Sequence, residues 1–260
     1  MIDTSKIMFS YTIGLLILGI NGLVIAIAVL RRFLWQYAVF YFYLSIFFAV
    51  GLLRFYVYTA RPSDYLFVFW WTEFLLVCAG YGVTWEIFNK TLANYRGVLR
   101  MARRVVSAIF FLALIQAFAN FWSSETGSFF RSVIRLERNM LVVQATLLSL
   151  LALLILYYKI PLGKNLAGLL YGYGLRISAY VLVLTARFYL GPASQSWLDM
   201  LRQSGDLGVM VIWAIALRSY QPSPQPEGDT RLEQDYAALA EQTGKALAAA
   251  RAQIARVFTS

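Results

Sequence analysis

The chain has 260 residues, of which 60% are apolar, 17% aromatic and only 14% charged, proportions outside the range of soluble domains. This composition indicates a polytopic membrane protein with room for six or seven crossings of about 20 residues each, and it leaves no space for a soluble domain of ordinary size. The net charge of +10 does not indicate nucleic-acid binding, because the basic residues cluster at the ends of apolar runs.

Several kinds of chemistry are excluded by residue type. The sequence contains no histidine, which removes His-based acid–base catalysis, haem ligation by His and most zinc sites. The single cysteine, Cys78, cannot form an intrachain disulfide. No phosphate-binding glycine loop, serine nucleophile elbow or paired-carboxylate metal spacing is present. We therefore expect no catalytic residues, no metal site and no cofactor.

An all-α fold with seven transmembrane helices is predicted from the apolar runs. They cover approximately residues 8–30, 35–60, 65–88, 105–122, 134–158, 165–190 and 207–217. The first run lacks the basic start and the cleavage site of a removable signal peptide, so we expect it to remain as a signal anchor. The last run is short; either it begins near Trp197, or a separate interfacial helix covers residues 196–202.

The distribution of basic residues predicts the orientation in the membrane. With the N-terminus outside, the inner side would carry Arg31, Arg32, Lys90, Arg96, Arg100, Arg103, Arg104, Lys159, Lys164 and Arg218. The outer side would carry only Lys6, Arg61, Arg131 and Arg202. Because basic residues are retained on the cytoplasmic side, we expect a multi-pass protein of the cell membrane with its N-terminus outside and its C-terminus inside.

The C-terminal part differs from the rest in composition. After a transmembrane domain over residues 1–218, a proline-rich linker at 219–229 is followed by a predicted cytoplasmic amphipathic helix at 230–258. This helix is interpreted either as a solvated helix or as a docking helix for a protein partner, a second copy or, less readily because its charge is mixed, the membrane surface. The residues expected to contact a cytoplasmic partner are Arg100, Arg103, Arg104, Leu232, Tyr236, Leu239, Leu247 and Ile254.

Charged residues inside the apolar runs need partners, because an isolated charge in a bilayer is costly. Arg54 and Glu73 lie at similar depth on two runs joined by a short turn, which predicts an ion pair between them. Arg176 and Arg187 share one face of a single predicted helix. For Arg176, near the midplane, only Gln144 and Tyr180 are predicted partners, whereas Glu86 is expected to balance charge at the inner end.

The polar positions concentrate between the outer surface and the midplane, which predicts an outward-opening cavity with surplus positive charge and aromatic walls. A small anionic or amphipathic ligand would suit such a cavity. The candidate ligand-binding residues are Arg54, Trp70, Glu73, Gln116, Glu137, Arg138, Gln144, Arg176, Tyr180 and Arg187. The alternative is a set of interhelical hydrogen bonds that fixes packing and binds nothing.

Gly168 and Gly172 have the small-residue spacing that permits close helix packing. They belong to a run, Pro161 to Gly168 followed by Gly172-Tyr173-Gly174, that resembles segments of uncharacterised bacterial seven-helix membrane proteins, some of them similar to the input modules of sensor kinases. The seven-helix layout is also similar to that of microbial rhodopsins. However, retinal attaches to a lysine in their last helix, and residues 205–217 contain none.

The resemblance implies a bacterial cytoplasmic membrane protein. The polar bias of the outer half and a tail suited to contact indicate signal transduction, and three functions are considered ahead of an intramembrane enzyme, for which no catalytic set is recognised. The preferred one is a receptor- or sensor-like module that binds a small ligand and contacts a cytoplasmic partner. The second is a non-catalytic accessory subunit of a larger membrane complex. The third, a transporter, is less favoured because all six prolines lie in predicted loops or in the tail, so that broken crossings are not indicated.

Overall fold

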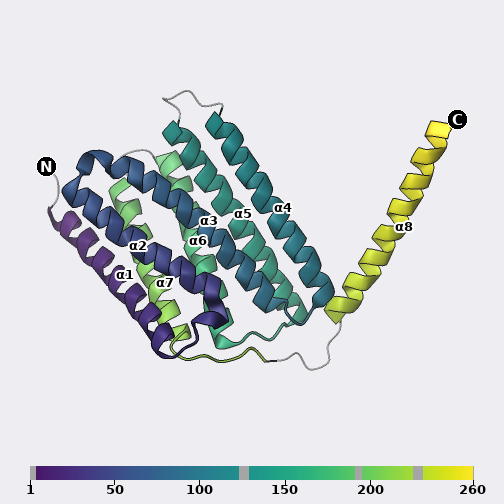
Figure 1. The fold of residues 1–260 in the computed structure, drawn as a ribbon, viewed down its shortest axis with the longest axis horizontal. Helices are drawn as coiled ribbons and strands as arrows, with labels where there is room; N and C mark the ends of the chain where they lie inside the picture. Colours follow the sequence, from purple (N-terminus) through teal and green to yellow (C-terminus); the bar gives the residue numbers. More distant parts are fainter. Residues whose placement is uncertain (1–3, 123–128, 191–194, 225–230, 260) are drawn as a thin grey trace.

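The computed structural model of the chain describes residues 4–122, 129–190, 195–224 and 231–259 (Figure 1). Most of these residues are helical, and none of them belongs to a strand. The helices are α1 (Thr4–Leu30), α2 (Ala38–Ala60), α3 (Tyr65–Thr91), α4 (Arg96–Trp122), α5 (Phe129–Tyr158), α6 (Lys164–Leu190), α7 (Gln195–Ala216) and α8 (Arg231–Thr259), with 3₁₀ turns at Leu34–Tyr37 and Pro62–Asp64. The predicted all-α class is confirmed.

Five segments of the described chain are long and apolar enough to cross a membrane. They are Thr12–Leu30, Leu34–Ala60, Pro62–Thr91, Glu137–Tyr158 and Lys164–Ala186. The chain is therefore a multi-pass membrane protein. Helices α4 and α7 do not meet this criterion: the first three turns of α4 hold four arginines, and α7 carries Asp199, Arg202 and Asp206.

Two predicted boundaries differ from the observed ones. Helix α7 begins at Gln195, close to the alternative start predicted near Trp197. Residues 196–202 therefore belong to α7 and do not form a separate interfacial helix. Helix α4 begins at Arg96, nine residues before the predicted start at Val105, so the basic segment is itself helical. Arginine is a good helix former, and its charge ends an apolar run without ending a helix.

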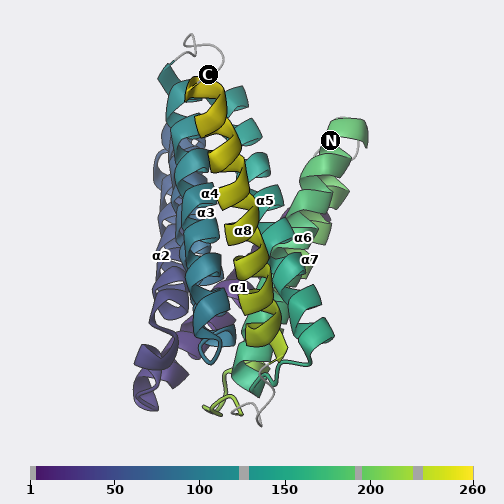
Figure 2. The ribbon, with the colours of Figure 1, turned by 90° about the vertical axis from the view of Figure 1, so that its right-hand side faces the viewer.

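Helices α1 to α7 form one bundle, and α8 extends away from it (Figures 1 and 2). Helix α1 packs against α2 and α7, and α6 packs against α5 and α7. Helix α3 contacts α2, α4, α5 and α6 and so has neighbours on several sides. Helix α4 lies at the edge of the bundle, where it contacts α3, α5 and α8.

The predicted close approach at Gly168 and Gly172 is confirmed. A Cβ atom at Gly168 would collide with Ala216 of α7, and one at Gly172 would collide with the indole of Trp213. Trp213 is fully buried and meets the ring of Phe40 edge-on at 4.9 Å between centroids. The two glycines therefore let α7 lie directly against α6.

Glu86 of α3 lies at the end of the bundle where α1 is followed by α2, which we call the inner end after the predicted orientation. Its position is more specific than the predicted charge balance. Its carboxylate accepts hydrogen bonds from the backbone N–H groups of Phe40 at 2.8 Å and Val39 at 3.4 Å. These groups belong to the first turn of α2, which has no partner of its own for them. Glu86 thus caps a helix other than its own.

The segment that follows α7 runs along the inner end of the bundle and is held by Asn165, which is buried. The Asn165 amide nitrogen donates to the carbonyl oxygens of Ala216 at 2.8 Å and Ser219 at 2.7 Å, and its side-chain oxygen accepts from the backbone N–H of Gln221 at 2.6 Å. Arg31 also donates to the carbonyl oxygen of Arg218 at 2.8 Å. We refer to residues 217–224 as the strap.

The start of α8 is attached to the bundle. Leu232 is buried and belongs to the main apolar core, and the Tyr158 hydroxyl donates to Asp235 at 3.0 Å. Tyr236 is half-buried and Leu239 is exposed. The remaining predicted tail contacts, Leu247 and Ile254, lie outside the residues whose side chains are described.

Candidate functional site

The predicted ion pair between Arg54 and Glu73 is present, with 3.0 Å between Nη1 and Oε1. The Arg54 guanidinium also donates to the Thr72 hydroxyl and to the carbonyl oxygen of Phe69, and it stacks over the Phe69 ring at 4.4 Å. Arg54 is therefore bonded to three residues of the first turns of α3, which fixes α2 against α3 near the turn that joins them.

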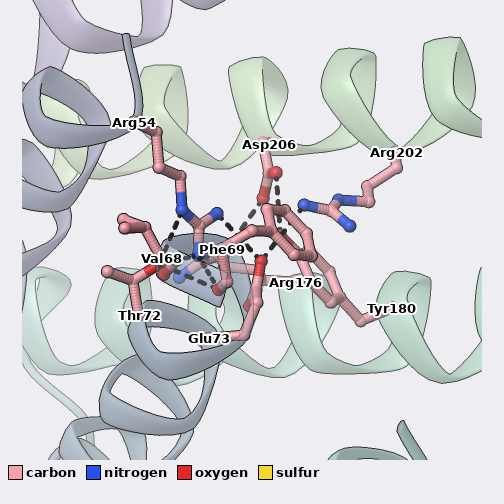
Figure 3. A network of polar contacts seen from close by, with 9 residues as sticks. All are labelled: Arg54, Val68, Phe69, Thr72, Glu73, Arg176, Tyr180, Arg202 and Asp206. Carbon is pink, nitrogen blue, oxygen red and sulfur yellow. Dashed lines mark hydrogen bonds and ion pairs between the residues drawn. The ribbon is translucent and has the colours of Figure 1, made fainter. Parts of the chain in front are cut away.

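Glu73 also connects α3 to α7. The same Oε1 atom that pairs with Arg54 lies 3.5 Å from Nη2 of Arg202 (Figure 3). The Arg202 guanidinium in turn lies over the ring of Tyr180 at 4.6 Å. One buried carboxylate is thus shared by two cations that come from opposite sides of it.

Arg176 has a partner that the sequence analysis did not identify. Its Nε donates to Oδ1 of Asp206 at 3.0 Å, and both side chains are about nine-tenths buried. The other Asp206 oxygen accepts from the Tyr180 hydroxyl at 3.3 Å. The rings of Phe47, Tyr43 and Tyr180 lie within 4.7 to 5.5 Å of the guanidinium carbon.

The predicted partner Gln144 instead bonds elsewhere. Its side-chain oxygen accepts from the Tyr173 hydroxyl at 3.0 Å, and its nitrogen donates to the carbonyl oxygen of Val77 at 3.3 Å. Gln144 is fully buried. A Cβ atom at Gly80 would collide with the Tyr173 hydroxyl, so glycine is required for this contact between α3, α5 and α6.

A cavity of about 30 Å³ lies beside these groups, which is room for one or two water molecules. It is lined by Tyr43, Glu73, Leu76, Val77, Glu137, Leu141, Gln144, Tyr173, Arg176, Ile177 and Tyr180. Pockets that hold drug-sized ligands are at least about ten times larger. In this conformation the cavity therefore admits only water-sized species.

The other predicted ligand residues are more dispersed. Trp70 and Arg138 are half-buried and are not among the described residues that line the cavity. Gln116 is exposed on α4. The side chain of Arg187 lies outside the described residues. The structure thus brings together Glu73, Glu137, Gln144, Arg176 and Tyr180 around the cavity, with Arg54 bonded to Glu73 behind it.

Six charged side chains at or next to the cavity balance one another, whereas Glu86, which is also buried, lies further along α3. Three arginines, Arg54, Arg176 and Arg202, face three acids, Glu73, Glu137 and Asp206, of which Glu137 lies within electrostatic range of Arg202. The predicted surplus of positive charge included Arg138 and Arg187 and did not include Asp206. We call these six residues, together with Tyr180, the outer network, because the orientation predicted from the sequence would place them in the outer half of the membrane.

Asp206 and Arg202 are the site residues that sequence reasoning missed. The last predicted crossing begins at residue 207, so both residues fall in the polar stretch that is predicted as an outer loop. Their spacing of four residues puts them on one face of a helix. This spacing is the signal that could have identified both residues as part of the site. It indicates a shared helix face only once α7 is known to begin at Gln195.

Comparison with known proteins identified no related protein: no family model, no curated protein and no solved structure matches the chain. Within the described residues there is also no group of three acidic or sulfur ligands positioned to hold a metal ion. The fold and site define an all-helical, multi-pass membrane protein with a charge-balanced polar network in its interior.

Proposed function

We propose that the chain is a receptor-like membrane protein with seven crossings, the N-terminus outside and the C-terminus inside. It binds a small ligand at the outer network and transmits the change to a cytoplasmic partner through α8. The observation that carries this proposal is the position of α7. Its Arg202 and Asp206 belong to the outer network, and at its C-terminal end it continues into the strap.

The charge balance suggests how binding would be coupled to movement. A ligand larger than water does not fit the cavity of about 30 Å³, so its entry requires the network to open. A carboxylate ligand can replace Asp206 on Arg176, or Glu73 on Arg202, because a guanidinium binds one carboxylate as well as another. Either exchange releases α7 from α6 or α3, so the ligand favours a conformation with α7 displaced.

The route from α7 to the tail consists of direct contacts. Asn165 bonds both the last turn of α7 and the strap, so a shift of α7 acts on the strap at once. The strap precedes α8, whose first turns are held by the core position of Leu232 and by the bond from Tyr158 to Asp235. Residues 237–246 of α8, which are exposed and include Leu239, are the surface offered to a partner.

Benzoate tests this proposal, since it is a small carboxylate with an aromatic ring suited to the walls around Arg176. We expect benzoate to raise the midpoint of thermal unfolding of the detergent-purified chain and to change the emission of a fluorophore at Leu239→Cys in a Cys78→Ser background. Neutral benzamide is the matched control. Both responses should disappear in Arg176→Leu/Asp206→Leu, which removes a charge pair without leaving either partner alone.

A second candidate is supported by a different observation. The surface of α2 that faces away from the bundle exposes large aromatic side chains, including Phe42 at 65% and Tyr56 at 61%. Such exposure is expected where lipid or another membrane protein covers these side chains. In an accessory subunit of a larger complex, the outer network would only fix packing. Purification in a mild detergent separates the two functions, because a stoichiometric membrane partner and no response to benzoate would favour the subunit. A transporter remains the third candidate.

A further inference from the structure

The inner end of α4 carries an exposed face of arginines that the outer network does not involve. Arg96, Arg100, Arg103 and Arg104 are all exposed, and at 100° per residue they fall within an arc of about 100° on the helix. No acidic residue occurs anywhere in the sequence of α4. We call these four residues the arginine face.

A hydrogen bond fixes the depth of the arginine face. Arg103 Nε donates to the side-chain oxygen of Asn89 at 2.7 Å. Asn89 lies two residues before Thr91, where the apolar span that includes α3 ends. The arginine face therefore lies at the level where a membrane span ends, which is the level of lipid head groups.

The protein itself provides little compensation for this charge. Among the described residues, no carboxylate forms an ion pair with any of the four arginines. Arg100 donates instead to the carbonyl oxygen of Arg96. Arg96 also occupies the first turn of α4, where the helix dipole already favours an anion over a cation. In the first turns of α8, Asp235 accepts from Tyr158.

Apolar side chains continue from the arginine face along the outward surface of the same helix. Met101 and Val105 are exposed beside the arginines, and Phe111, Leu112 and Ile115 are more than 60% exposed further along. A cationic end followed by an exposed apolar length matches a lipid, with an anionic head group and acyl chains, better than it matches a soluble anion.

We propose that the arginine face is a binding surface for anionic lipid head groups, with the acyl chains lying along the exposed apolar surface of α4. It depends on α4 crossing the membrane and is independent of ligand binding at the outer network. Each arginine near an anionic membrane surface contributes to the binding free energy. The loss of three should therefore weaken phosphatidylglycerol binding by at least about tenfold.

Native mass spectrometry of the full chain in detergent tests the proposal, with phosphatidylglycerol and phosphatidylcholine of the same acyl chains as probes and no benzoate present. The variant is Arg96→Gln/Arg100→Gln/Arg104→Gln, which keeps Arg103 and its bond to Asn89. The control, Lys159→Gln/Lys164→Gln/Arg218→Gln, removes the same charge from exposed positions at the same end of the bundle. Replacement of the three arginines by lysine retains the charge and serves as a second variant if the first does not fold.

The wild type, the control and the lysine variant should bind phosphatidylglycerol at least about tenfold more tightly than phosphatidylcholine, whereas the glutamine variant should not distinguish them. Equal binding of both lipids by the wild type would overturn the proposal, as would an equal loss in the control. Displacement of the lipid by free glycerol phosphate at matched concentration would indicate a site for a soluble anion. If the glutamine variant retains the preference, the arginine face is not the lipid-binding surface and the proposal is wrong. An acidic protein partner is then the remaining candidate for this surface.

Discussion

The outer network gathers three arginines from three helices, whereas the arginine face carries four on a single helix, and their surroundings differ. In the outer network, Arg54, Arg176 and Arg202 each lie within 3.0 to 3.5 Å of a carboxylate oxygen. On the arginine face, the guanidinium groups are exposed and, among the described residues, none pairs with a carboxylate. A buried cation must receive its counter-charge from the chain, whereas a cation at the end of a span can receive it from the surroundings.

The largest effect should follow from the removal of a single carboxylate of the outer network. Asp206→Leu leaves Arg176 buried without its partner, which should lower the free energy of unfolding by about 3–5 kcal/mol. Thermal or denaturant unfolding of the purified chain in detergent measures the loss. In Arg176→Leu/Asp206→Leu most of the stability should return, because neither charge is then alone. If the double variant is as unstable as the single one, the pair is not the reason for the loss.

The contact that brings α7 into the outer network should be the next most sensitive. Gly172→Ala places a methyl group against Trp213, and overpacking of this kind costs about 1–3 kcal/mol. Gly174→Ala is the control on the same helix, since no neighbouring atom lies within 4 Å of a Cβ built there. Unfolding midpoints measured side by side should differ. Equal midpoints would show that α6 and α7 do not pack as closely as described.

A buried acid at the inner end extends the comparison beyond arginine. Glu86→Ala deprives the first turn of α2 of its acceptor and should cost about 0.5–2 kcal/mol, the range for the loss of a helix cap. Glu86→Gln keeps an acceptor oxygen and should lose less. Hydrogen exchange of the Val39 and Phe40 amides would localise the effect, and unchanged exchange in Glu86→Ala would contradict the cap.

The smallest effect is expected where the charges are exposed. Arg100→Gln/Arg104→Gln should change the free energy of unfolding in lipid-free detergent by less than about 0.5 kcal/mol, as for other surface substitutions. The same unfolding assay used for Asp206→Leu measures it. A loss comparable with that of Asp206→Leu would mean that the arginine face is paired within the chain, and the contrast with the outer network would disappear.

The sequence predicted those parts of the site that depend on neighbours along the chain. Arg54 and Glu73 could be paired because a short turn joins their helices. The Arg176–Asp206 pair could not be predicted, because it depends on where α7 begins. In the sequence alone, the polar residues of the first turns of α7 resemble those of a loop. The class of fold follows from composition, whereas the volume of the cavity depends on how individual side chains pack, which no pattern of residue types specifies.

The glycine and tail predictions show the same limit. The spacing of Gly168 and Gly172 identified a close contact, but the partner helix could not be read from α6 alone. For the tail, an apolar stripe was recognised, yet the stripe did not show that its first member, Leu232, belongs to the core of the bundle. Periodicity indicates which face of a helix is apolar, and only the tertiary structure shows what covers it.

The core position of Leu232 has a practical consequence for shortened forms of the protein. The proline-rich linker is the obvious place to cut the chain, but a form that ends there would expose the apolar surface that Leu232 covers and would lose the bond from Tyr158 to Asp235. A form that ends shortly after Leu239 would keep both contacts. The folded body of the protein therefore extends into α8, and fusion or truncation sites belong beyond its first two turns.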